Sequence, residues 1–187
     1  MSETTDLTGR LLIAMPGMGD PRFAKAVIFL CAHGEDGAMG LIINKPAPEL
    51  SFFDLLEQLS IEPGTASRRP IHFGGPVEGA RGFVLHSRDY EGDTATLGVG
   101  EAFGMTATLE ILRDMAAGTG PSSALVTLGY AGWGPGQLES ELAENGWLVT
   151  DAAPDLVFSR DDERKWIAAI ETLGFDPIML SAASGRA

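Results

Sequence analysis

The sequence predicts an α+β protein in which a mixed, mostly antiparallel sheet carries helices on its outside. Short apolar runs typical of strands outnumber the helical patterns, and several are separated only by tight turns. The regular strand–helix alternation of a doubly wound fold is absent. The 187 residues, of which 44% are hydrophobic and 21% charged, suit one domain over residues 1–187, with loose ends at residues 1–9 and 181–187.

Three strands are expected in the first quarter of the chain. Residues 10–15 form a short apolar strand that Pro16 stops. Residues 26–32 and 38–44 flank Asp36 and Gly37, a pair that is typical of a hairpin turn. Since both runs are apolar almost throughout, we expect them near the centre of the sheet, covered on both faces.

A helix is expected after Ser51, because Ser51 can cap its free N–H groups and Asp54 favours its first turn. The apolar stripe of this helix comprises Phe52, Leu55, Leu56 and Leu59. Further short strands are expected at residues 70–73, 82–86 and 95–99.

The second half of the chain contains further helical patterns. A helix from Thr106 or Thr108 to Gly118 is expected to bury Leu109, Leu112, Met115 and Ala116. Strands are expected at residues 124–128, 147–150 and 156–158. A last helix, capped by Ser159 or Asp161, is expected to turn inward Trp166, Ile167, Ile170 and Leu173. Asp161 and Lys165 lie one turn apart on it and predict a surface pair worth about 0.3 kcal/mol.

Residues 128–139 form the most unusual part of the chain, and we call them the glycine-rich segment. It holds four glycines and Trp133 between a strand and a helix that Pro135 is expected to open. So many glycines indicate an unusual backbone path or a close approach to the backbone. The segment imitates a phosphate-binding loop, but it has no lysine and Glu139 and Glu141 follow it. Trp133 is expected either as an exposed recognition anchor or as a lid over the core.

The charge balance is strongly acidic, with 26 acidic against 13 basic residues and a net charge of -13. Binding DNA normally takes a basic face, and the only adjacent basic pairs are Arg68–Arg69 and Arg164–Lys165, so direct nucleic-acid binding is disfavoured. The N-terminus lacks the basic and apolar stretches of a secretory signal, and the longest apolar run, residues 26–32, is too short to cross a bilayer. We therefore expect a cytoplasmic protein without a membrane partner.

No catalytic, metal or cofactor site is predicted. Cys31 and His33 would share one strand face, where a thiol and an imidazole can act as nucleophile and base, but the apolar run around Cys31 favours a buried, inert thiol. His72 and His86 have no second ligand at metal-binding spacing. A single cysteine excludes an intrachain disulfide and fits a reducing compartment.

Several segments carry a family resemblance in consecutive order. They include Leu-Leu-Ile-Ala-Met-Pro-Gly-Met at 11–18, Asp-Pro-Arg-Phe at 20–23, Cys-Ala-His at 31–33, residues 37–46, Gly-Gly-Pro-Val at 74–77, residues 81–86, the glycine-rich segment, Asn-Gly-Trp-Leu at 145–148 and the helix around Trp166. Together they resemble the YqgE/AlgH family of small bacterial proteins. The resemblance implies a strongly bent sheet curled into a pseudo-barrel with helices packed outside. One branch of that family is described as a transcriptional regulator of exopolysaccharide (alginate) production, and the resemblance implies no catalytic residues. The family often ends in Gly-His-Ala, whereas this chain ends in Gly185-Arg186-Ala187.

These observations favour a non-catalytic binding or regulatory protein that acts through a protein partner or a small ligand and affects transcription indirectly. Its binding surface is expected at loops that follow strands and in the glycine-rich segment, at Met15, Pro16, Asp20, Asn44, Gly75, Gly132, Trp133, Gly136 and Gln137. Two alternatives stay open. One is an enzyme that uses a strand-end cleft with Cys31 and His33 or His86, and the other is a transcriptional regulator that contacts DNA directly.

Overall fold

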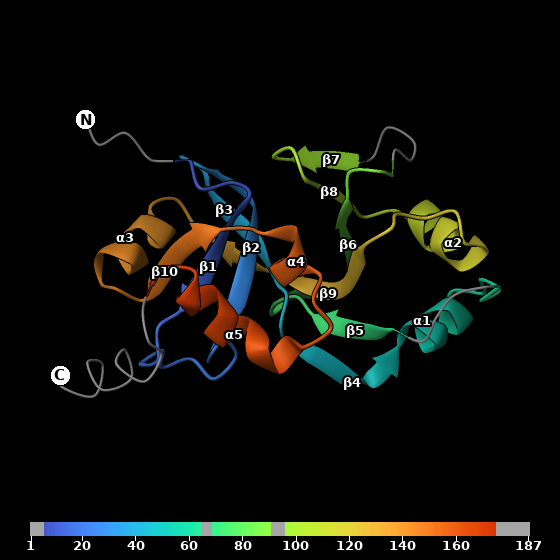
Figure 1. Ribbon diagram of the computed structural model, residues 1–187, viewed down its shortest axis with the longest axis horizontal. Coiled ribbons are helices and arrows are strands. Elements are labelled where there is room, and N and C mark those ends of the chain that lie inside the picture. The colour runs from blue at the N-terminus through green and yellow to red at the C-terminus, as the bar shows by residue number, and fades with distance from the viewer. Residues whose placement is uncertain (1–5, 65–68, 91–95, 175–187) are drawn as a thin grey trace.

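The structure is a computed structural model that describes residues 6–64, 69–90 and 96–174 (Figure 1). Within these ranges the strands are β1 (Arg10–Ala14), β2 (Val27–Gly34), β3 (Gly37–Ile42), β4 (Pro46–Ser51), β5 (Pro70–Phe73), β6 (Val77–Ser87), β7 (Thr96–Val99), β8 (Phe103–Thr106), β9 (Ala124–Trp133) and β10 (Trp147–Asp151). The helices are α1 (Phe52–Gln58), α2 (Leu109–Ala117), α3 (Gln137–Ala143), α4 (Pro154–Val157) and α5 (Asp162–Glu171).

The strands form one curled sheet in which β9 joins the two ends. In the described part of the chain the order is β10-β1-β2-β3-β9-β6-β8-β7, with β4 and β5 paired beside β9. The C-terminal end of β9 pairs antiparallel with β3, and its N-terminal part pairs antiparallel with β6 and parallel with β5. The other described pairs are antiparallel. The predicted mixed, mostly antiparallel sheet is therefore confirmed.

Alternating side chains place the core on both faces of β1 and β2, which agrees with the central position predicted for β2 and β3. On one face, the buried residues that cluster with Trp166 and Ile170 of α5 include Leu11, Ile13, Val27 and Phe29. On the other face, the residues that cluster with Leu138 of α3 include Leu12, Ala14, Ile28 and Leu30.

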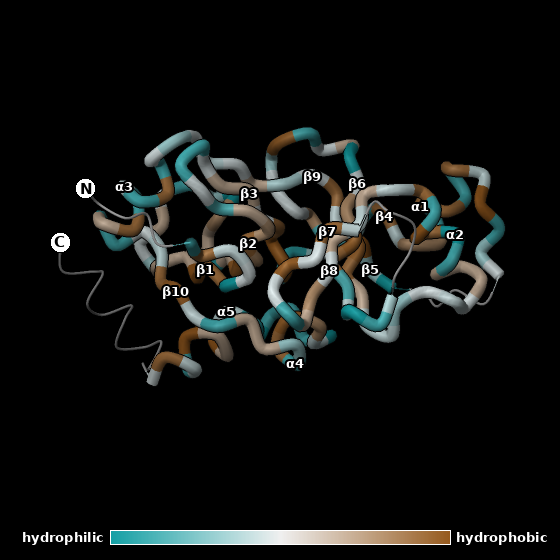
Figure 2. The backbone as a smooth tube through the Cα atoms, turned by 90° about the horizontal axis from the view of Figure 1, so that it is seen from above, coloured by the Kyte–Doolittle hydropathy of each residue, from teal (hydrophilic) through white to brown (hydrophobic). Residues whose placement is uncertain are grey.

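Helices α1 and α2 cover the end of the sheet away from α3, as both views show (Figures 1 and 2). A third core cluster lies there and includes Phe52, Leu56, Ile71, Ile111 and Leu112. Seen from above, apolar segments concentrate along the strands, while polar segments occupy many of the outer turns (Figure 2).

Several local predictions are confirmed. The hairpin between β2 and β3 pairs Gly34 with Gly37. At the start of α1, the Ser51 hydroxyl accepts from the Asp54 N–H at 3.2 Å, and the Asp54 carboxylate accepts from the Ser51 N–H at 3.1 Å. Gly118 ends α2 in the left-handed conformation with φ 82°, as a C-terminal glycine does.

Other predictions are wrong for identifiable reasons. Residues 156–158 are not a strand but lie in and just after α4, which Pro154 begins. The sequence prediction also lacks β4, which contains two prolines, and the four-residue β8. Ile167 and Leu109 are 36% and 46% exposed rather than buried. Successive helix residues point about 100° apart, so Trp166 and Ile167 cannot both face the sheet.

Parts of three predicted segments fall outside the described residues. Residue 95 of the strand now seen as β7 does so, and so do residues 1–5 and 181–187 of the expected loose ends. Leu7, within the first nine residues, is buried. Helix α3 begins at Gln137, two residues after Pro135. Within the described ranges, no helix is both long and apolar enough to cross a membrane.

Candidate functional site

Much of the glycine-rich segment is strand rather than loop. β9 continues to Trp133, so the prediction that its strand ends at residue 128 is wrong. Gly129 has φ 76°, and a Cβ at this position would overlap the carbonyl oxygen of Gly75. Glycine therefore allows β9 and the turn after β5 to pass in backbone contact.

Trp133 points inward and is only 7% exposed. Its indole Nε1 donates to Oε1 of Glu141 at 3.2 Å, and the same oxygen accepts from Nε1 of Trp147 at 2.9 Å. Gln137 donates its amide to the second oxygen of Glu141 at 2.9 Å. We call these four residues the tryptophan cluster. Of the two orientations expected for Trp133, the structure has the lid over the core.

Most of the other expected surface residues remain accessible. Met15 lines a shallow hollow of about 580 Å³ beside α3 and β10. Asp20 is half-buried and pairs with Arg22 at 2.7 Å. The remaining accessible members are the half-buried Pro16 and the exposed Gly132, Gly136 and Gln137.

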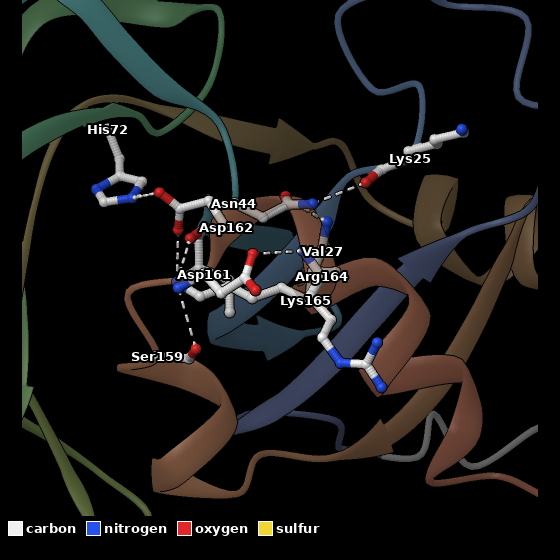
Figure 3. A network of polar contacts seen from close by, with 10 residues as sticks. Lys25, Val27, Asn44, His72, Ser159, Asp161, Asp162, Arg164 and Lys165 are labelled. Atoms are coloured by element: carbon white, nitrogen blue, oxygen red, sulfur yellow. Dashed lines mark hydrogen bonds and ion pairs between the residues drawn. The ribbon is translucent and has the colours of Figure 1, made fainter.

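Asn44 and Gly75 connect parts of the fold. The Asn44 side chain accepts from the Val27 N–H at 2.9 Å and donates to the Lys25 carbonyl at 2.8 Å (Figure 3). Gly75 is buried against the backbone of Tyr130. Both residues join a turn to a neighbouring strand, so their local geometry has a structural explanation.

Two of the three histidines use both ring nitrogens in hydrogen bonds. His33 Nδ1 accepts a backbone N–H at 3.0 Å, so Nε2 carries the proton and donates to Glu139 at 2.5 Å. His86 Nδ1 donates to the Ser87 carbonyl at 2.8 Å, which leaves Nε2 to accept from the Thr106 hydroxyl at 2.8 Å. Burial lowers the pKa of His86.

Among the described residues, neither His33 nor His86 is placed to activate Cys31. Its side chain is buried, and burial raises the pKa of the thiol to about 12. The ring nitrogens of His33 and His86 bind other groups, so the structure forms neither of the thiol–imidazole pairs considered from the sequence. Among the described residues, no three His, Cys, Asp or Glu side chains are grouped to hold a metal ion.

His72 on β5 belongs to a different arrangement. Its ring is 2% exposed, and Nε2 contacts Oδ2 of Asp162 at 2.9 Å. Oδ1 of Asp162 pairs with the Lys165 ammonium at 2.9 Å, and Lys165, 1% exposed, also donates to the Ile43 carbonyl at 2.8 Å (Figure 3). We call His72, Asp162 and Lys165 the charged network. The predicted surface pair of Lys165 with Asp161 is wrong, because Lys165 faces the sheet instead.

The charges of this network balance one another. Burial raises the pKa of the Asp162 carboxyl, but hydrogen bonds from His72 and Lys165 outweigh it and hold the pKa below its ordinary value. Burial lowers the pKa of the Lys165 ammonium, and Asp162 opposes that effect. Asp162 is thus an ionised carboxylate, with His72 at Oδ2 and the Lys165 ammonium in an ion pair with Oδ1.

A cleft of about 330 Å³ opens beside His72, between β5, the start of β9 and the loop before α5. Its polar lining comprises Arg69, His72, Ser122, Ser123, Ser159, Arg160 and Asp162. Nδ1 of His72 and Nε of Arg69 are buried and have no hydrogen-bond partner in the part of the chain that the structure describes. Such atoms are uncommon in folded proteins and indicate a missing partner.

Arg69 is held in place although it is only half-buried. Its guanidinium lies 5.7 Å from the centroid of the Phe52 ring, and Nη1 donates to the Ala124 carbonyl at 3.3 Å. Burial lowers the pKa of Arg69, and the positive charge of Arg160 lowers it further. Within the described ranges, neither arginine has a carboxylate at ion-pair distance. Two cations therefore line one cleft without a counter-charge of their own.

The sequence interpretation did not find this cleft. Its polar residues come from residues 69–72, 122–123 and 159–162, which no motif connects. The one available signal was the basic pair that contains Arg69, because such pairs are rare in this acidic chain.

Comparison with known proteins agrees with the resemblance seen in the sequence. A family described as AlgH-like matches residues 11–178. A UPF0301 protein of Ruegeria pomeroyi is 61% identical over 184 residues, which cover 97% of this chain and 100% of that protein. A UPF0301 protein of a Jannaschia species is 60% identical over 187 residues, covering 98% of this chain and 97% of that protein.

Solved structures show the same fold. The solution structure of the AlgH protein from Pseudomonas aeruginosa has a TM-score of 0.77 and 43% identity, and the match covers 97% of this chain and 96% of that one. The X-ray structure of protein DIP2367 from Corynebacterium diphtheriae also has a TM-score of 0.77, at 20% identity, over 98% of this chain and 94% of that one. The latter is a likeness of fold alone. From its matched residues and its relatives, the chain belongs to the AlgH-like family, also called YqgE/AlgH.

Proposed function

We propose that this protein is a non-catalytic binding protein whose ligand occupies the cleft beside His72. The observation that carries the proposal is the buried Nδ1 of His72, which has no partner in the described chain while Asp162 fixes the other ring nitrogen. A buried polar atom left unpaired costs about 1–3 kcal/mol. A ligand atom in the cleft would supply the partner. Effects on transcription then arise indirectly, through the bound ligand.

Binding accounts for this geometry better than catalysis does. An imidazole backed by a carboxylate can act as a general base, and serines line the same cleft. Yet no serine hydroxyl is hydrogen-bonded to His72 among the described residues, so a nucleophile–base pair is not assembled. The buried thiol of Cys31 offers no alternative nucleophile, since burial raises its pKa to about 12.

Direct DNA binding is also disfavoured. The net charge is -13, and the cations without a counter-charge lie in a cleft of about 330 Å³. A duplex is held by an extended basic face that contacts several phosphates along its backbone.

The three histidines provide an internal test of the cleft. Long-range proton–nitrogen NMR spectra report the ring nitrogens of His33, His72 and His86 separately. The protein is titrated with a set of small neutral, cationic and anionic organic compounds. We expect at least one chemical class to shift the His72 nitrogens while those of His33 and His86 stay in place, because their ring nitrogens are already paired. If no class moves His72, the proposal is wrong.

The hollow beside α3 supports a second candidate, a surface for a protein partner. It measures about 580 Å³, and Met15 and Met18 line it. Methionine adapts its shape to a partner and recurs at binding surfaces. Of the accessible residues of the expected surface, Met15 lines this hollow. A pull-down from a bacterial extract should lose a partner on Met15→Gln with the circular dichroism spectrum unchanged; an identical partner set would reject this surface.

A further inference from the structure

The cleft beside His72 is a positively charged site on an acidic protein. Arg69 and Arg160 line it without ion-pair partners among the described residues. Asp162 is the one acidic side chain in the described lining; its Oδ2 contacts His72, and its Oδ1 forms an ion pair with Lys165 at 2.9 Å. With Asp162 and Lys165 compensating each other, the two guanidinium charges remain for a ligand.

The nearby carboxylates outside the lining are also engaged. Asp89 accepts from the Ser122 N–H at 3.0 Å, and Asp161 accepts from the Arg164 N–H at 3.2 Å as the cap of α5. α5, ten residues long, begins beside the cleft. Asp161, Asp162 and Glu163 at its start already compensate the positive end of its dipole, so the attraction for an anion comes from the two arginines.

Hydrogen-bond donors are arranged on several sides of the cleft. Arg69 offers the buried Nε–H, and the unpaired Nδ1 of His72 lies in the same lining. Ser122, Ser123 and Ser159 line the cleft as well. This donor set suits an anion with several oxygens.

We propose that the cleft binds the phosphate group of a small phosphorylated molecule, held by Arg69 and Arg160 beside the ring of His72. The inference rests on the cleft being the ligand site proposed above. A phosphate monoester carries about -1.5 to -2 charges and three terminal oxygens, which match two guanidinium groups and the donors around them. A carboxylate has one charge and two oxygens and would leave donors unpaired. A volume of about 330 Å³ fits a phosphate with a small organic group.

The proposal is tested by titrating the labelled full-length protein with phenyl phosphate, inorganic phosphate and benzoate, following the ring nitrogens of His72. We expect phenyl phosphate to bind at least tenfold more tightly than benzoate, a difference of about 1.4 kcal/mol. The comparison with inorganic phosphate separates the two sources of the anion. Tighter binding of phenyl phosphate indicates a phosphate ester, whereas tighter binding of inorganic phosphate would replace the ester with the free ion and overturn the small-molecule part of the proposal.

Matched arginine variants locate the binding. Arg69→Gln and Arg160→Gln should each weaken phenyl phosphate binding at least tenfold. The control is Arg81→Gln, since Arg81 also lies over an aromatic ring, 5.1 Å from the centroid of Phe83, but does not line the cleft. Circular dichroism spectra establish that each variant is folded. Equal weakening by all three variants would show only a loss of overall charge and would overturn the proposal.

The failure of this inference can be told apart from the failure of the proposed function. If another class of compound shifts His72 and phenyl phosphate does not, the phosphate inference is wrong while the ligand cleft stands. If nothing shifts His72, both are wrong.

Discussion

The tryptophan cluster and the cleft beside His72 both combine charged and aromatic residues, yet they differ in how their polar atoms are paired. In the tryptophan cluster, Glu141 accepts from two indole N–H groups and from the amide of Gln137. In the cleft, His72 and Arg69 each keep a buried nitrogen that has no partner in the described chain. Groups that satisfy one another stabilise the fold, whereas buried nitrogens without a partner indicate a place for a ligand.

The residue that attracts attention in the sequence therefore has a structural role. Trp133 stands in the glycine-rich segment, and its side chain is enclosed. The residues of the cleft stand in ordinary surroundings and have no motif. Substitutions should separate the two regions, since those in the tryptophan cluster should change stability and those in the cleft should change binding.

The largest effect is expected for Trp133→Ala. Truncating a buried tryptophan removes its packing and leaves Glu141 without one donor, which should lower the free energy of unfolding by about 3–5 kcal/mol. Urea denaturation measures the change. Leu97→Ala is the control, because Leu97 is 48% exposed and its truncation should change stability by less than about 0.5 kcal/mol. Similar losses for the two variants would contradict the enclosed position of Trp133.

Lys165→Met should follow, with a loss of about 2–4 kcal/mol. Methionine fills a similar volume, but the buried Asp162 carboxylate and the Ile43 carbonyl lose their donor. Lys25→Met removes an exposed lysine and serves as the control. If the two variants have the same stability in thermal and in urea unfolding, Lys165 does not hold α5 to the sheet.

Glu141→Gln tests the pairing within the tryptophan cluster. The substitution turns one acceptor into a donor, so either the indoles or Gln137 lose their partner, and we expect a loss of about 1–2 kcal/mol. Glu144→Gln, on the exposed residue that follows α3, should be nearly neutral in the same urea titration. An effect confined to Glu144 would refute the assigned hydrogen bonds.

The dependence of stability on acidic pH should reveal the contribution of the Asp162 carboxylate. Its folded pKa lies below the ordinary value, so its contribution to stability is complete above the unfolded pKa of about 3.9 and is lost as the pH falls through the folded pKa. Urea unfolding between about pH 5 and pH 3 should show a steeper loss for the wild type than for Asp162→Asn. Parallel profiles would show that Asp162 does not carry the depressed pKa.

The smallest effect on stability is expected for Arg69→Gln without ligand, less than about 0.5 kcal/mol. The variant loses the stacking on Phe52, but it also removes an unpaired Nε and the repulsion from Arg160. Thermal unfolding measures this value beside the tenfold loss of binding expected for the same variant. A loss of stability as large as that of Lys165→Met would show that Arg69 stabilises the fold.

Local features were predictable because their causes lie within a few residues. Ser51 and Asp54 cap α1 across one turn, and Gly118 ends α2 through its own backbone conformation. The path of the glycine-rich segment was not predictable, since Gly129 is required by a carbonyl more than fifty positions earlier, at Gly75. A high glycine content suggests a loop equally well.

The cleft was hidden for a related reason. His72 and Asp162 meet only because β5 pairs with β9 and α5 packs across the sheet. Helical spacing alone favoured Asp161 as the partner of Lys165, and it could not show that Lys165 faces the interior. The family resemblance predicted the fold but implied no residue of the cleft.

The attachment of α5 has a consequence for the synthesis of the chain. Lys165 reaches a carbonyl 122 positions earlier, and Trp166 Nε1 donates to the Ala14 carbonyl 152 positions earlier. The strands around Ala14 leave the ribosome long before the helix that covers them, and contacts across such separations form late in folding. Because Ser159, Arg160 and Asp162 line the cleft, it is complete only when nearly the whole chain has been made. A nascent or truncated chain that lacks residues 159–162 therefore lacks one wall of the cleft.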